Sequence, residues 1–245
     1  MSEIIKTEAV VLSKLNYGDT SYIISLYTKE LGKISAIVKG ARSPKSKLGL
    51  ITDPVNHLQV VLYKKDTREL QIISSADLLS NFTELKSDFD KLKYSQAIIE
   101  LVKKLTAEHE TNSRLFHGIV RILELLNSSD EKPNILFGRF FLFFIEELGY
   151  EMSLERCSVC GRTIEPDAGV SFNFGTGILC HVCRKEKAES YIFTPELFNY
   201  LYCLKSRKKI EVKEKLADKA ISFLENYLRY HIPDFKGIQS LQIYN

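Results

Sequence analysis

The chain has 245 residues, 44% of them hydrophobic, and this size and composition predict a folded protein with one large core or a few small ones. The 34 basic residues barely outnumber the 31 acidic ones, so total charge alone does not indicate a nucleic-acid binder. The longest apolar run, Ile135 to Ile145, contains Arg139 and is shorter than the roughly 20 residues of a membrane-spanning helix. The N-terminal residues lack the pattern of a signal peptide, so we expect a cytoplasmic protein with no membrane segment.

The first 76 or so residues have the pattern of short β-strands separated by turns. The expected strands lie in residues 7–14, 21–28, 33–40, 55–63 and 69–75. Five strands in so short a segment predict a small barrel of the OB-fold type, a common platform for single-stranded nucleic acid. We therefore expect an OB-fold, nucleic-acid-binding domain over residues 1–78.

The hydrophobic period becomes helical after this segment, which makes the whole chain α+β. Helices are expected within residues 89–109, 114–126, 134–150, 194–206 and 213–231. The helix that contains Phe140 is apolar nearly all round and should be the buried central one. Thr194 is the expected N-cap of the next helix, with Pro195 at its first position. We expect one helical bundle domain from residues 79–155 and 190–245, with a zinc-binding module, residues 156–189, inserted in it.

Four of the five cysteines form two Cys-x-x-Cys pairs: Cys157 with Cys160, and Cys180 with Cys183. The 19 residues between the pairs fit a tetrahedral zinc site, whose pairs are separated by roughly 15 to 20 residues. Residues 170–180 read as a hairpin that returns the second pair to the first, and Gly161 stands where a positive φ is often needed. Four thiolates leave no open position, so we predict one structural Zn²⁺.

Other roles for the cysteines fit the sequence less well. Deaminase chemistry needs a His-x-Glu motif, which the chain lacks, and a thioredoxin-type dithiol lacks its βαβ context here. His181 could replace one cysteine as ligand, although an exposed side chain is the simpler interpretation. Cys203 has apolar neighbours and is interpreted as a small buried side chain without a functional role.

A second feature is the stretch from Leu31 to Thr52, which has five basic residues and no acid. The candidate nucleic-acid-binding residues are Lys33, Lys39, Arg42, Lys45 and Lys47. Glycine, serine and proline after Val38 predict a loop from residue 40 to 49, which suits contacts with backbone phosphates. The alternative is a solvated basic loop without a ligand. Among the tyrosines, residues 22, 27 and 63 could stack on bases or belong to the core.

Three motifs in order, YGDTS from Tyr17, GKISAIVKGAR from Gly32 and LGYEMSLERCSVCG from Leu148, carry a resemblance. Together they resemble the RecO family of bacterial DNA repair and recombination proteins, over essentially the whole chain. The resemblance implies an N-terminal OB-fold, a helical domain and a zinc-binding module, with no catalytic residue. It also implies a nucleoid-associated mediator that binds single- and double-stranded DNA and anneals complementary strands. Such a mediator acts with RecR, RecF and the single-strand-binding protein to load the recombinase.

The same resemblance implies that the acidic C-terminal tail of the single-strand-binding protein, which ends in phenylalanine, binds an apolar slot beside a basic residue. Arg139 interrupts a phenylalanine-rich helix and offers such a guanidinium. The alternative is that the phenylalanines are core and that Arg139 pairs with Glu146 or another acid.

Two other functional classes compete with DNA binding. A protein-interaction scaffold with a structural zinc and no direct nucleic-acid role is the main alternative. A metalloenzyme is disfavoured by the closed cysteine set and by the lack of a Ser-His-Asp, P-loop or GxGxxG pattern.

Overall fold

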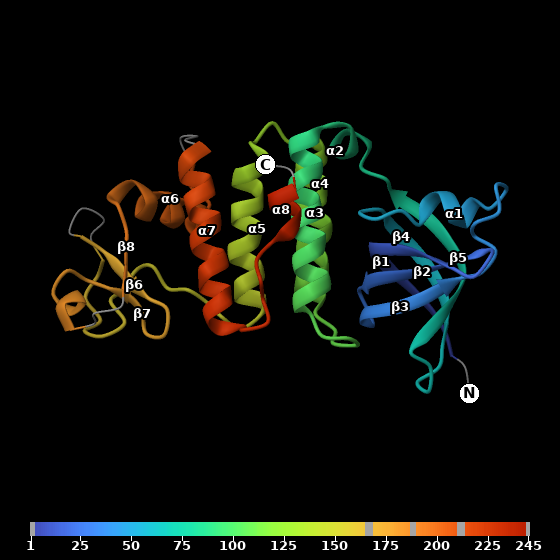
Figure 1. The fold of residues 1–245 in the computed structure, drawn as a ribbon, viewed down its shortest axis with the longest axis horizontal. Coiled ribbons are helices and arrows are strands. Elements are labelled where there is room, and N and C mark those ends of the chain that lie inside the picture. The colour runs from blue at the N-terminus through green and yellow to red at the C-terminus, as the bar shows by residue number, and fades with distance from the viewer. Residues whose placement is uncertain (1–2, 165–168, 187–189, 210–213, 244–245) are drawn as a thin grey trace. The chain divides into compact units, whose positions relative to one another are not determined.

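The computed structural model describes residues 3–164, 169–186, 190–209 and 214–243 (Figure 1). Contacts divide the chain into two compact units, Met1–Asp130 with Ile238–Asn245, and Glu131–Gly237. The first helices and the C-terminal one therefore belong with the barrel, and the helices between them belong with the cysteine module, whereas the sequence predicted a single bundle. Helical periodicity identifies the apolar face of each helix but not the helix that it meets. The finer domain boundaries stay a prediction.

The first unit contains a closed five-stranded barrel in the order β1-β2-β3-β5-β4. Its strands are β1 (Glu3–Tyr17), β2 (Ser21–Thr28), β3 (Gly32–Val38), β4 (His57–Lys64) and β5 (Leu70–Ser80). β3 and β5 pair in parallel, and the other neighbours are antiparallel. This is an OB-fold, and it confirms the five predicted strands.

β1 is long enough to pair with two neighbours. Its first half pairs with β4 and its second half with β2. The register shifts between Val11 and Ser13, and a bulge of this kind bends a strand so that a barrel can close. Inward-facing side chains from all five strands, among them Ile24, Ala36 and Val60, form the barrel core.

The basic stretch contains a short helix, α1 (Lys47–Ile51), where the sequence predicted a loop to residue 49. Ser46 caps it by accepting a hydrogen bond from the Gly49 amide, and Leu48 and Ile51 pack against the barrel core. A Cβ at Gly49 would lie 1.9 Å from the Ala41 carbonyl oxygen, so only glycine fits. The prediction failed because long-range packing stabilises a helix that is too short to be marked by periodicity.

Besides α1, the helices of the first unit are α2 (Thr83–Ser87), α3 (Phe89–Leu105), α4 (Ser113–Ser128) and α8 (Gln239–Ile243). Asp88 caps α3 and Asn112 caps α4, each by accepting a backbone N–H of the first turn. α3 contacts β1, β2, α4 and α8. It is therefore the element that joins the barrel to the helices of this unit.

The second unit contains α5 (Pro133–Glu147), α6 (Pro195–Ser206) and α7 (Glu214–His231), with a sheet of β6 (Ser171–Asn173), β7 (Gly177–Leu179) and β8 (Tyr191–Ile192). A 3-10 turn, η2, follows at Cys183–Glu186. α5 contacts both other helices, as a buried central helix should, and Thr194 caps α6 with Pro195 at its first turn, as predicted. Within the described residues, no helix is long and apolar enough to cross a membrane.

Candidate metal centre and nucleic-acid interface

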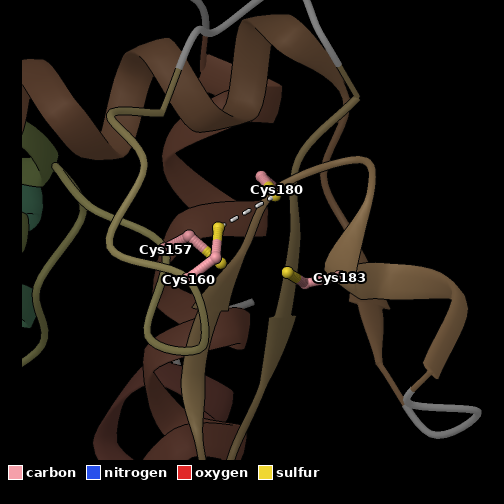
Figure 2. A group of neighbouring side chains, drawn as sticks. All are labelled: Cys157, Cys160, Cys180 and Cys183. Carbon is pink, nitrogen blue, oxygen red and sulfur yellow. Dashed lines mark hydrogen bonds between the residues drawn. The ribbon is translucent and has the colours of Figure 1, made fainter.

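The four cysteines of the two pairs converge on one point. Their sulfur atoms all lie within 4.8 Å of one another, and the Cys160 and Cys180 Sγ atoms are 3.8 Å apart (Figure 2). Cys157, Cys180 and Cys183 are buried, whereas Cys160 is exposed. A disulfide needs an S–S distance of about 2.05 Å, so these cysteines are free thiols placed around a common centre.

Backbone hydrogen bonds hold the two cysteine loops in place. The Cys157 amide donates to the Arg162 carbonyl at 2.8 Å, and the Gly161 amide donates to the Cys157 carbonyl at 2.9 Å. Gly161 has a φ of 69°, the positive value expected at this turn. The Ser158 amide donates to the Ile178 carbonyl of β7 at 2.9 Å. The β6–β7 hairpin thus returns the second pair to the first, as the sequence predicted.

Hydrogen bonds within the cluster favour the thiolate form of two of the four cysteines. Burial acts to raise the pKa of Cys157, but backbone N–H groups, that of Cys160 foremost, hydrogen-bond its sulfur and lower the pKa to about 6. The backbone N–H of Cys183 likewise lowers the pKa of Cys180. The pKa of Cys183 is raised to about 12, chiefly by its hydrogen bond with Cys160 and then by desolvation. A dication at the centre would favour the thiolate form of all four ligands.

The donor set fits zinc. A Zn–S bond of about 2.3 Å in a tetrahedron implies sulfur atoms about 3.8 Å apart, which is the spacing of Cys160 and Cys180. Cys157, Cys160, Cys180 and Cys183 would be the ligands, and a closed four-thiolate set supplies structural support. His181 is exposed and is not in the cluster, and Cys203 lies on α6 away from it.

Four of the five candidate DNA-binding cations lie at one end of the barrel. Lys39, Arg42, Lys45 and Lys47 are all exposed, and they follow β3 into α1. The Arg42 guanidinium donates to the Gly18 carbonyl at 2.7 Å, which ties this basic loop, residues 39–47, to the β1–β2 turn. The three lysines are therefore presented to solvent by a loop with a fixed base.

Lys33 is not part of that group, which corrects the set of candidates from the sequence. It is 8% exposed, and its ammonium donates to the carbonyls of Lys103 at 2.9 Å and Thr106 at 2.5 Å, at the end of α3. Glu108 lies 3.6 Å from the same ammonium. The Lys33 ammonium therefore binds backbone carbonyls at the C-terminal end of α3, where a positive charge is favourable. A phosphate could not reach the ammonium without displacing these carbonyls.

The outer surface of the barrel has a feature that the sequence analysis missed. Cross-strand partners form one continuous outer row in the order Leu15, Ile23, Ile37, Ile72, Tyr63 and Ile4. These positions alternate with the core residues and face outward, and the row ends, Leu15 and Ile4, are 63% and 66% exposed. In the sequence, this row is visible only as apolar residues on both faces of β2 and β3. From the sequence alone, such residues are interpreted as part of a core.

The tyrosines divide between the two expected roles. Tyr27 is 1% exposed and belongs to the interior, and Tyr22 lies under the Lys14 ammonium, which is 4.2 Å from the ring centroid. Tyr63, at 40%, and Tyr17, at 50%, are exposed on the barrel. Tyr17 directly precedes the β1–β2 turn that Arg42 contacts. It was not among the tyrosines that the sequence suggested for stacking on bases.

Arg139 is already paired within the second unit. One of its terminal nitrogens is 2.7 Å from Glu131 Oε2, and the other donates to the Lys208 carbonyl at 3.0 Å. Phe137, Phe141 and Phe144 on the same helix are fully buried. This is the arrangement given above as the alternative, with Glu131 in place of Glu146, and tail binding stays a prediction.

Comparison with known proteins bears on both sites. Residues 1–82 match the family model described as Recombination protein O N terminal, and residues 86–237 match Recombination protein O C terminal. The chain belongs to the RecO family. It is 34% identical to the DNA repair protein RecO of Chlorobium limicola, over 94% of this chain and 93% of the relative. It is 32% identical to DNA repair protein RecO of Alkaliphilus metalliredigens, over 98% of both chains.

Because the chain belongs to the RecO family, both sites are interpreted as parts of a DNA repair protein. The N-terminal match spans the barrel and its basic loop, and the C-terminal match includes all four clustered cysteines. The cysteine cluster is compatible with zinc, as the sequence predicted.

Proposed function

We propose that this RecO-family chain is a DNA-binding recombination mediator that anneals complementary single strands. In this role it helps to load a recombinase onto protein-coated single-stranded DNA, without catalysing a chemical step. The observation that carries the proposal is the exposed basic loop at the rim of an OB-fold barrel. Its cations would neutralise phosphates, which single- and double-stranded DNA share.

The outer row supplies a second contact that only single strands can use. Ile37 and Lys39 are two residues apart on β3 and its continuation, so the apolar row begins beside the basic loop. OB-folds bind oligonucleotides over the face of strands 2 and 3. A single strand with its phosphates on the loop would lay unpaired bases over Ile23 and Ile37, with Tyr17 available for stacking.

The metal is proposed to be one structural Zn²⁺ held by the four clustered cysteines. Its thiolate set is closed, so its role is to join the two cysteine loops. RecR, RecF and the acidic tail of the single-strand-binding protein are proposed as partners, since a mediator must act on DNA that other proteins cover. A protein that acts on chromosomal DNA would be located in the bacterial cytoplasm, at the nucleoid.

One observation favours the alternative of a protein-interaction scaffold. The outer row is mainly aliphatic, with Tyr63 as its one aromatic member, whereas platforms for bases rely on aromatic stacking. A neutral aliphatic surface also suits a protein partner.

Titration of a labelled oligonucleotide at several salt concentrations separates the two functions. Replacing Lys45 and Lys47 by glutamine should weaken binding to every sequence and reduce the salt slope for single strands by about 1.4, at about 0.7 per lost contact. The matched control replaces Lys215 and Lys219, two exposed lysines of α7, by glutamine and should bind like the parent. Equal affinity of loop variant and parent would favour the scaffold.

The same titration tests the path of the bases. Tyr17→Ala should weaken single-strand binding by about fivefold or more, the loss of one stacked base, and leave duplex binding unchanged. Equal loss for duplex and single strand would place Tyr17 on the phosphate path instead.

A further inference from the structure

The C-terminal residues have no place in the proposed function, and their position is unusual. The chain leaves the first compact unit after Asp130, builds the second unit, and returns to the first at Ile238. α8, Gln239–Ile243, then packs on α3. The two units are therefore joined by the chain at two places, 130–131 and 237–238.

One carboxylate holds the returning segment. Glu100 on α3 accepts hydrogen bonds from the backbone amides of Gln239 and Ser240, each at 2.8 Å. These amides are at the start of α8, where N–H groups have no partner within the helix, and a negative charge is favourable there. Lys104, one turn along α3, donates to the same carboxylate at 2.7 Å.

Two apolar side chains complete the attachment. Ile238 is fully buried and Leu241 is 9% exposed. Because α8 has only five residues, its position depends on these side chains and on Glu100 rather than on its own helical stability.

The residues just before Ile238 are held by the second unit. Arg229 on α7 donates to the Lys236 carbonyl at 3.4 Å. Gly237 has a φ of 95°, a backbone conformation that other residues rarely adopt, so this position favours glycine. The backbone is thus held by Arg229 on one side of the 237–238 junction and by Glu100 on the other.

We infer that residues 238–243 are a strap that limits movement of one unit relative to the other, with Glu100 as its clasp. When the strap is attached, both connections constrain the units, whereas release leaves only the 130–131 connection. A short segment held by one carboxylate and two side chains opens at a lower free-energy cost than the barrel or the helices. The inference is independent of the proposed role in DNA binding.

Hydrogen exchange tests the clasp directly, because Glu100 accepts from two amides that can be followed. In Glu100→Gln the peptide that contains residues 239–243 should exchange about tenfold faster or more, with β1 to β5 and α5 unchanged. The control is Glu124→Gln on α4, whose partner Arg121 is 3.4 Å away in an exposed pair, and it should match the parent. Unchanged exchange in Glu100→Gln would overturn the role of Glu100.

Small-angle scattering tests the strap itself. A chain that ends at Gly237 should keep the thermal unfolding transitions of the barrel and helices but show a broader pair-distance distribution than the full chain. Leu241→Ala is the milder variant if the shortened chain does not fold, and it should shift the distribution in the same direction. Superimposable curves from a folded variant and the parent would show that the strap does not limit movement.

Discussion

Lys33 shows how one position in a basic run can differ from its neighbours. Its place in β3 directs the side chain outward, like that of Ile37, but α3 ends over this part of the barrel. The ammonium therefore satisfies carbonyls that the helix leaves without partners, a stabilising role. Lys39, on the same face beyond the strand end, has no such cover and is exposed.

Exchange of Lys33 for methionine should lower the free energy of unfolding by about 1–3 kcal/mol, because two partly buried carbonyls lose their donor. Lys39→Met, the matched control, should change stability by less than about 0.5 kcal/mol. Urea unfolding of both variants measures the difference. A stable Lys33→Met variant with weakened DNA affinity would return Lys33 to the phosphate-binding set.

At the scale of elements, the cysteine module is two loops and a hairpin with little core of its own. β6 and β7 have three residues each, and Phe172 supplies a buried contact by packing edge to face on Phe223 of α7 at 5.4 Å. Elements this short need an additional constraint, which a metal ion provides in many small modules.

Cys180→Ser should therefore lose most of about one equivalent of bound zinc and loosen the module, whereas Cys203→Ser should keep the metal. Metal analysis of reduced, chelator-free protein, with proteolysis of the module as second readout, makes the comparison. Protons compete with zinc for the four thiolates, so zinc retention should fall as the pH is lowered. A parent with clearly less than half an equivalent would refute the site.

At the scale of the whole molecule, each proposed partner needs a surface of its own. Arg139 is the candidate for the acidic tail, but Glu131 already occupies its guanidinium. The Arg139 and Glu131 side chains are 22% and 32% exposed, so the pair is accessible to a competing carboxylate.

Two substitutions should therefore act in opposite directions on binding of the tail peptide. Arg139→Ala should weaken it, and Glu131→Gln should strengthen it by up to about fivefold, because the competing charge is removed. Fluorescence anisotropy with the labelled peptide measures both, and oligonucleotide affinity should stay constant. If both variants bind like the parent, the tail docks elsewhere and Arg139 has a structural role.

The sequence by itself determined the barrel strands, the long helices and the cysteine module, because their signals are local. Alternation and turn residues located all five barrel strands, Thr194 and Pro195 located the start of α6, and the spacing of Cys157 to Cys183 located the cluster. Only the tertiary structure decided what surrounds each side chain. Burial of Lys33, the outward row from Leu15 to Ile4 and the clasp at Glu100 all depend on segments far apart in the chain, and periodicity within one segment does not contain that pairing.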